Sequence, residues 1–162
     1  PGAPGQGRWV YGDNFQALGV LETRSGPPGR RTELSMYVGE GFWRQCRLRR
    51  YVLRLDGFVS VQAPLSGGEV VTRPLVFDGN RLELNFATSG AGRIGVEIQE
   101  ADGRPIEGFL LGDCDELFGD SLDEVVTWRD NPNVNRIAGR PVRLRFIVRD
   151  ADLFSFRFFS DR

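Results

Sequence analysis

Hydrophobic and polar side chains alternate along most of the chain from residue 47 onward. This alternation is clearest in three segments, Arg81–Phe86, Arg93–Ile98 and Val142–Phe146. A period of two sends successive side chains to opposite faces of a strand, so these segments predict half-buried antiparallel β-strands. Further strands are expected at Glu69–Leu75, Val125–Trp128 and Leu153–Phe159. No segment keeps a helical apolar period beyond two turns, and the best helical candidate is one turn at Asp115–Gly119.

Short clusters of turn residues separate the predicted strands. Asp56-Gly57 and Asp102-Gly103 each lie between apolar runs, and Asp-Gly supplies the positive φ angles of a type I′ turn. Each dipeptide therefore predicts a β-hairpin. The first hairpin would join residues 50–55 to residues 58–63.

Many short strands punctuated by 21 glycines and 9 prolines predict an all-β fold. We expect two antiparallel sheets stacked as a β-sandwich of the jelly-roll or concanavalin-like type, with a barrel as the less favoured closure. The side chains predicted to face inward are Phe86, Ile94, Val96, Phe146, Phe156 and Phe158. Residues 46–162 are assigned to this sandwich domain.

Residues 1–45 have a different pattern. Pro/Gly-rich stretches at the start and at Gly26–Arg31 flank two strand candidates, Phe15–Glu22 and Thr32–Val38. Two strands are marginal on their own in water. This N-terminal segment is therefore expected to pack on the sandwich or on a partner.

Length and charge restrict the partners of the chain. Its 162 residues suit one main domain, and 21 basic against 22 acidic side chains remove the usual electrostatic attraction to nucleic acid. No apolar run approaches the ~18 residues of a membrane span, and the first residues lack the pattern of a signal peptide. We expect a soluble chain that binds neither nucleic acid nor a membrane.

Missing residue types restrict the chemistry. Histidine is absent, which excludes histidine-based triads and histidine-ligated zinc, and every basic residue is arginine, which excludes lysine Schiff bases. Any catalysis would use carboxylates, tyrosines or a metal bound by oxygens. Cys46 and Cys114 can form one bridge or remain thiols. The two cysteines do not determine the cellular compartment of the protein, and an extracellular or periplasmic location is favoured.

Several long sequence segments resemble a known protein family. They are RWVYGDNFQALGVLET, ELSMYVGEGFW, the stretch from RLRRYVLRLDGFVSVQ to RLELNFATS, and PVRLRFIVRDADLFSFRF. Between Arg8 and Phe158 the chain resembles the C-terminal portion of bacterial proteins described as glycoside hydrolases and similar to family 32 (invertase and levanase) enzymes. Those enzymes join a five-bladed catalytic β-propeller to a β-sandwich. The resemblance implies that residues 8–43 are the last propeller strands, residues 47–162 are the sandwich, and the chain is a piece of a longer polypeptide.

This resemblance implies an accessory role. A propeller gathers its catalytic carboxylates from several blades, so one blade cannot supply the pair that glycoside cleavage needs. Glu22 and Glu40 lie in the propeller-like segment, where the simpler interpretation is a solvent-facing strand glutamate. We expect a non-catalytic module that binds carbohydrate. The alternatives are a structural domain that docks on the catalytic propeller and, less favoured, a carboxylate-dependent glycoside hydrolase.

Aromatic residues beside planar polar groups are candidate carbohydrate-binding residues, because aromatic rings stack on the apolar faces of sugars. The candidates for a poly- or oligosaccharide are Trp9, Tyr11, Trp43, Trp128 and Asn131. Trp128 follows a predicted strand and opens into a polar loop. The alternative for Trp128 is a core tryptophan that seals the sandwich.

The acidic loop at residues 112–124 is a candidate structural calcium site, because calcium prefers six to eight oxygen ligands. Its candidate ligands are Asp113, Asp115 and Asp120. The loop is not an EF-hand, since Leu117 and Phe118 occupy positions that the motif reserves for an oxygen ligand and a glycine. The alternative is a solvated loop whose acids cap local backbone. No other cofactor is expected.

The concentration of arginines between residues 44 and 54 suggests nucleic-acid binding as one interpretation; it comprises Arg44, Arg47, Arg49, Arg50 and Arg54. A period of two splits it, with Arg47 and Arg49 on one strand face and Arg50 and Arg54 on the other. Salt bridges on the two faces of a sheet are the better explanation.

Overall fold

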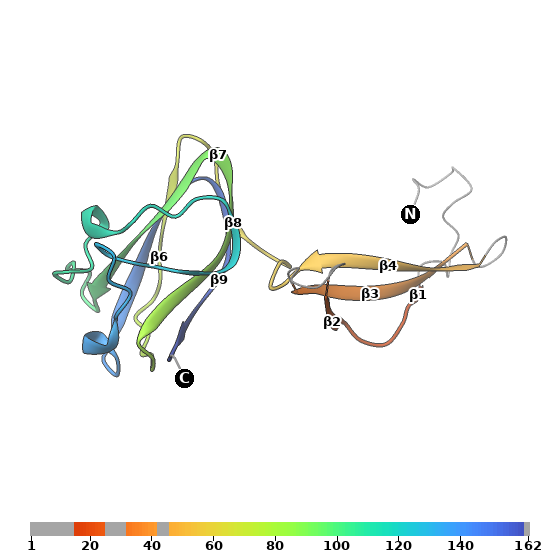
Figure 1. Ribbon diagram of the computed structural model, residues 1–162, viewed down its shortest axis with the longest axis horizontal. Helices are drawn as coiled ribbons and strands as arrows, with labels where there is room; N and C mark the ends of the chain where they lie inside the picture. The colour runs from red at the N-terminus through yellow and green to blue at the C-terminus, as the bar shows by residue number, and fades with distance from the viewer. Residues whose placement is uncertain (1–14, 25–31, 42–45, 161–162) are drawn as a thin grey trace. The chain divides into compact units, whose positions relative to one another are not determined.

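The computed structural model describes residues 15–24, 32–41 and 46–160, and within them the chain is all-β. Two antiparallel sheets of four and five strands account for the regular structure, with two short 3-10 turns and no α-helix in these ranges (Figure 1). The all-β, antiparallel two-sheet prediction is confirmed. The elements are β1 (Phe15–Gln16), β2 (Leu21–Arg24), β3 (Thr32–Glu40), β4 (Arg47–Arg54), β5 (Val61–Ala63), β6 (Gly68–Val71), β7 (Arg81–Glu100), η1 (Leu111–Asp113), β8 (Asp120–Val125), η2 (Asn135–Ile137) and β9 (Val142–Phe159).

The chain divides into two compact units, Pro1–Phe58 and Val59–Arg162. The sequence had placed this division after residue 45, which would put β4 in the C-terminal domain. In the structure β4 pairs along its whole length with β3, from Glu33↔Arg54 to Glu40↔Arg47. β4 therefore belongs to the N-terminal sheet, in which β1 and β2 pair with the opposite edge of β3.

The Asp56-Gly57 hairpin prediction is wrong. β4 pairs with β3, and β5 pairs with β9, so the two segments flanking this dipeptide are not partners. Asp56 alone has a positive φ, 55°, and the Gly57 N–H donates to the Arg54 carbonyl at 2.9 Å. The dipeptide makes a tight turn that leads from one unit into the other.

The Asp102-Gly103 hairpin prediction is confirmed, although its turn type is not. The Gly103 N–H donates to the Glu100 carbonyl at 2.9 Å, and Ile106 donates to Ile98 at 2.9 Å across the hairpin. A type I′ turn needs two consecutive positive φ angles, whereas here only Gly103 has one, 93°.

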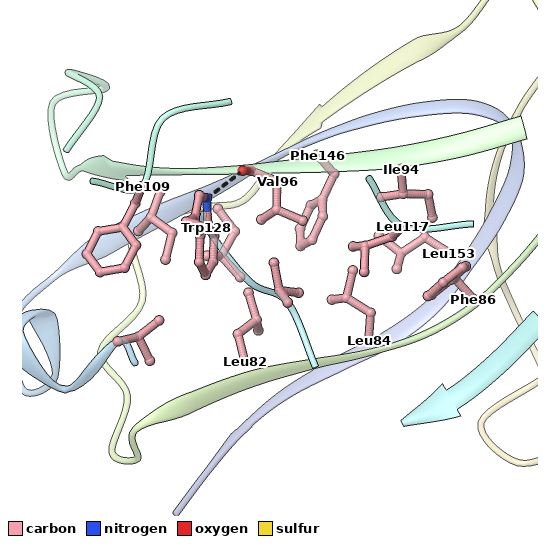
Figure 2. Close-up of a cluster of buried hydrophobic side chains, with 14 of the residues drawn as sticks. Leu82, Leu84, Phe86, Ile94, Val96, Phe109, Leu117, Trp128, Phe146 and Leu153 are labelled. Carbon is pink, nitrogen blue, oxygen red and sulfur yellow. Dashed lines mark hydrogen bonds between the residues drawn. The ribbon is translucent and has the colours of Figure 1, made fainter. Parts of the chain in front are cut away.

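Two long strands, β7 and β9, organise the C-terminal unit. They pair in two stretches, separated by a register shift between Thr88 and Arg93, and the remaining strands extend the order β5-β9-β7-β8 with β6 also on β9. The sequence predicts separate strands at Arg81–Phe86 and Arg93–Ile98, but β7 includes both and continues through the Ser-Gly-Ala-Gly cluster at residues 89–92 between them. Figure 2 shows Leu82, Leu84 and Phe86 from one half of β7 pointing across the core toward Ile94 and Val96 from the other.

A single apolar core fills this unit. Phe86, Ile94, Val96 and Phe146 are each at most 1% exposed, and Phe156 and Phe158 pack against them partly buried. The predicted inward-facing set is therefore confirmed. The helical turn expected at Asp115–Gly119 is absent, and the 3-10 turns lie instead in η1 and η2. The described residues contain no helix with the length and apolar character needed to cross a membrane.

The register shift in β7 places a glycine where no side chain fits. A Cβ on Gly92 would lie 2.2 Å from the carbonyl oxygen of Asp150, whereas a Cβ on Gly90 would meet nothing within 4 Å. We expect Gly92→Ala to lower the free energy of unfolding by about 1–3 kcal/mol or more, because backbone must move to relieve the overlap. Gly90→Ala, the matched control, should stay within about 0.5 kcal/mol. Urea unfolding of both variants measures the difference, and equal stabilities would contradict this account of the bend.

Candidate functional site

The structure brings four of the predicted site residues together in the C-terminal unit. The segments Asp113–Asp115 and Thr127–Asn131 meet through a bridge between Cys114 and Trp128. We call these two segments the 113–131 corner. Of the other candidates, Trp9, Tyr11 and Trp43 lie outside the described residues.

A strained two-residue turn forms the outer part of this corner. Trp128 and Asn131 exchange backbone hydrogen bonds of 3.0 and 3.1 Å around Arg129 and Asp130. These two residues have φ angles of 52° and 62°, which is the type I′ geometry that glycine usually supplies. Side chains in this region cost about 1 kcal/mol or more each, so other contacts must stabilise the turn.

The aspartates of the corner supply those contacts. Asp115 accepts a hydrogen bond from the Thr127 hydroxyl at 2.5 Å and another from the Asp130 N–H at 2.9 Å. The Asp113 carboxylate accepts from the Arg129 guanidinium at 2.6 Å. The hydrogen bonds from Thr127 and Asp130 lower the pKa of Asp115. Both carboxylates therefore accept hydrogen bonds from other groups of the same chain.

The calcium site suggested by the acidic loop is not assembled. Asp120 lies on β8 opposite Ala87, while Asp113 and Asp115 point to the turn. In the part of the chain that the structure describes, no group of three or more cysteine, aspartate or glutamate side chains is placed to hold a metal ion. The alternative interpretation, acids that cap local backbone, describes what Asp115 does.

Trp128 is a core residue, which corrects its assignment as a sugar platform. Its side chain is 3% exposed, its indole N–H donates to the Val96 carbonyl at 3.0 Å, and Phe109 packs edge-on with ring centroids 5.2 Å apart (Figure 2). No ring face is left for a sugar. Asn131 is exposed, and its side-chain oxygen accepts the Asn133 N–H at 3.0 Å.

The contacts of Asp115 make the corner sensitive to pH. Because its pKa is lowered in the folded protein, the ionised carboxylate contributes stability that is present above pH 3.8, the ordinary value, and is lost as the pH falls through the lower folded value. We expect Asp115→Asn to be less stable than the parent protein at pH 7, with the difference shrinking as the pH falls below 4. Urea unfolding at several pH values measures it. Asp123→Asn, at an exposed aspartate of β8, is the control, and a stability difference for Asp115→Asn that does not vary with pH would contradict the assignment.

Charged groups on the N-terminal sheet divide between its two faces, as the period-two pattern predicts. Arg50 crosses one face, where its guanidinium donates to Ser35 and Thr23 at 2.9 Å and contacts Glu33. On the opposite face Arg47 and Arg49 are paired with Glu40. The salt-bridge interpretation is therefore confirmed for Arg47, Arg49 and Arg50, whereas Arg44 lies outside the described residues.

The sequence did not reveal the environment of Glu40. Glu22 is exposed, as expected of a solvent-facing strand glutamate, but Glu40 is only 7% exposed and accepts a hydrogen bond from the Tyr51 hydroxyl. This hydrogen bond, with Arg49 and Arg47 nearby, lowers the pKa of Glu40. The sequence alternation does place Arg47, Arg49 and Tyr51 on one face of a strand. It does not show that Glu40 lies beside them, because that depends on the pairing register of β4 with β3.

Both cysteines are free thiols in the structure, one in each of the two units. Cys46 is exposed at the start of β4. Cys114 is partly buried under the corner, and its desolvation raises its pKa to about 11.

Comparison of the chain with models of protein families, with curated proteins and with solved structures finds no match. The resemblance to the C-terminal portion of family 32-like glycoside hydrolases therefore stays a prediction. The architecture described above is compatible with it, since an N-terminal sheet precedes an all-β unit with its own core.

Proposed function

We propose that the chain is a non-catalytic accessory module of a glycoside hydrolase, in which residues 59–162 form a β-sandwich and the N-terminal sheet contributes the last strands of a neighbouring catalytic propeller. One observation carries this proposal. The N-terminal sheet has apolar side chains on both faces and buries none of them, since every buried apolar residue of the described chain lies in the C-terminal unit.

The register of the strands shows how these side chains are distributed. On one face Phe15, Leu21, Leu48 and Val52 are each more than half exposed. On the other face, half-buried apolar side chains lie along β3 and β4: Leu34, Met36, Val38 and Leu53. A sheet with two apolar faces is suited to burial between two layers, as in the stacked blades of a propeller.

The C-terminal unit supports a structural role over carbohydrate binding. Its core is closed, and the tryptophan that would have bound sugar is inside it. Its buried carboxylates are paired as well: Glu83 contacts Arg157 at 2.8 Å and Glu97 contacts Arg145 at 3.3 Å. Carboxylates neutralised by arginine are poorly suited to act as the acid and nucleophile of a glycosidase.

Hydrogen exchange tests the proposal. The chain would be produced alone and joined to whatever polypeptide its gene encodes immediately upstream. We expect amides of β3 and β4 to gain protection in the longer protein, those of β7 and β9 to stay unchanged, and only the longer protein to cleave glycans. Unchanged protection of β3 and β4, or glycan cleavage by residues 1–162 alone, would overturn the proposal.

A further inference from the structure

Three aspartates of the chain are followed directly by glycine, in Asp56-Gly57, Asp78-Gly79 and Asp102-Gly103. An Asp-Gly sequence can rearrange chemically, because the main-chain nitrogen of the glycine can attack the side-chain carboxyl group of the aspartate and no Cβ hinders its approach. The reaction requires that these two groups can move together. The contacts that hold them at each site therefore decide its reactivity.

Hydrogen bonds hold the glycine nitrogen at two of the three sites. The Gly57 N–H donates to the Arg54 carbonyl at 2.9 Å. The Gly103 N–H donates to the Glu100 carbonyl, also at 2.9 Å. Each of these hydrogen bonds must open before the nitrogen can reach a carboxyl group.

The carboxyl group of Asp102 is restrained as well. It accepts hydrogen bonds from the main-chain N–H of Arg104 at 3.1 Å and from Nε of Arg104 at 2.7 Å. These hydrogen bonds lower the pKa of Asp102. Only the neutral acid can release its oxygen as water, so a lowered pKa reduces the reactive fraction at a given pH.

Asp78-Gly79 has neither restraint. Asp78 is exposed, and within the described part of the chain no hydrogen bond or ion pair involves its carboxyl group or the Gly79 N–H. Gly79 has a φ of 125°, in a bend just before β7. Both reacting groups are therefore available in the folded protein.

We propose that Asp78-Gly79 is a modification site, at which Asp78 converts to isoaspartate in the folded protein without an enzyme. The Gly79 nitrogen attacks Cγ of the neutral carboxyl group, and one carboxyl oxygen leaves as water with the proton of the acid and the proton of the amide. The product is a five-membered succinimide.

Water then breaks one of the two C–N bonds of the succinimide. Breaking the bond to Cγ restores aspartate, whereas breaking the bond to the main-chain carbon gives isoaspartate with a free α-carboxylate. The water released in the first step is taken up in the second, so no oxidant or other reactant is needed. The site lies in the C-terminal unit and does not depend on the accessory role.

Isoaspartate adds one carbon to the main chain between two fixed points. The Phe77 carbonyl accepts from the Gly139 N–H at 2.9 Å, and the Asn80 N–H donates to the Phe159 carbonyl at 2.9 Å. Gly79 itself lies against β9, since a Cβ on it would be 2.7 Å from the Phe159 carbonyl oxygen. The longer chain cannot bulge in that direction. We therefore expect the isoaspartate form to unfold at a lower urea concentration.

The experiment incubates the full 162-residue chain at mildly acidic pH, with and without urea. Peptide mapping by mass spectrometry with electron-transfer fragmentation measures isoaspartate at residues 56, 78 and 102. In the folded protein we expect residue 78 to react roughly three- to tenfold faster than the other two, because a hydrogen bond must open first at those sites. In urea the three rates should become similar, since the dipeptides are identical and their contacts are lost.

Asp78→Glu keeps the charge and changes the size of the ring that must form. Glutamate would have to close a six-membered ring, which forms much more slowly. We expect this variant to accumulate little isoaspartate when folded and to keep its urea midpoint during incubation. Asp102→Glu is the matched control, in which residue 78 should react at the parent rate and the midpoint should fall as it does in the parent.

Several results would overturn this site. They are equal rates at the three aspartates of the folded protein, a faster reaction at residue 56 or 102, and reaction at residue 78 in urea only. A folded Asp78→Glu protein that accumulates as much isoaspartate as the parent would also overturn it. None of these outcomes affects the accessory role, which is measured by protection of β3 and β4 in the longer protein.

Discussion

A chain that begins at Val59 is expected to unfold in one cooperative transition, at the same urea midpoint as the C-terminal unit in the whole protein. The reason is that residues 59–162 contain the entire buried apolar core of the described chain. Residues 1–58 alone should show no cooperative transition, because a sheet that buries no apolar side chain cannot offset the loss of chain entropy on folding. Circular dichroism follows both pieces. Trp128, the one tryptophan in residues 59–162, reports on the C-terminal unit by fluorescence.

A chain that begins at residue 46 is the matched control for this prediction. It carries β4 without β3, its partner, so it should be no more stable than the chain beginning at Val59. A clear gain in stability would mean that β4 packs on the C-terminal unit, as the sequence-based boundary implied. Cooperative folding of residues 1–58 alone would contradict the description of the N-terminal sheet.

The strands of the core could be predicted because apolar and polar residues alternate along their sequences. In Arg81–Phe86 the apolar residues fall at every second position, and Leu82, Leu84 and Phe86 are all fully buried. The pattern fixes which face of a strand is apolar, and burial of that face is the main stabilising contribution. Local alternation was therefore sufficient for the fold class and for the interior side chains.

Pairing partners could not be predicted in the same way. β4 alternates equally well whether it pairs with β3 or with β5, because alternation carries no information about which strand lies beside it. The Asp-Gly dipeptide after β4 favoured the wrong neighbour. Similarly, the Ser-Gly-Ala-Gly cluster marks a bend inside β7, since Gly92 is needed for close approach to Asp150 rather than for a chain reversal.

The orientation of Trp128 in the candidate site could not be predicted either, because it depends on a residue that is distant in sequence. A polar loop after Trp128 suggested that the ring faces solvent, but Arg129 and Asp130 reverse the chain so sharply that the polar groups lie outside while the indole turns inward. The contact that fixes the ring, the Val96 carbonyl, is 32 residues away in sequence. Only the folded chain brings this acceptor to the indole.

Replacement of Trp128 therefore distinguishes a core residue from a sugar platform. We expect Trp128→Ala to lower the free energy of unfolding of the C-terminal unit by about 3–5 kcal/mol, because a large buried ring is replaced by a cavity. Trp128→Phe keeps most of the packing against Phe109 but leaves the Val96 carbonyl without its donor, at a cost of about 1–3 kcal/mol. Urea unfolding followed by circular dichroism measures both variants.

The matched control is Asn131→Ala, which changes an exposed residue of the same turn and should have a much smaller effect than Trp128→Ala. A sugar platform predicts the opposite pattern: Trp128→Ala would keep its stability and lose binding to insoluble polysaccharide. A Trp128→Ala protein that unfolds at the same urea concentration as the parent would contradict the core assignment. It would also require the indole to leave the hydrogen bond to Val96 and face solvent.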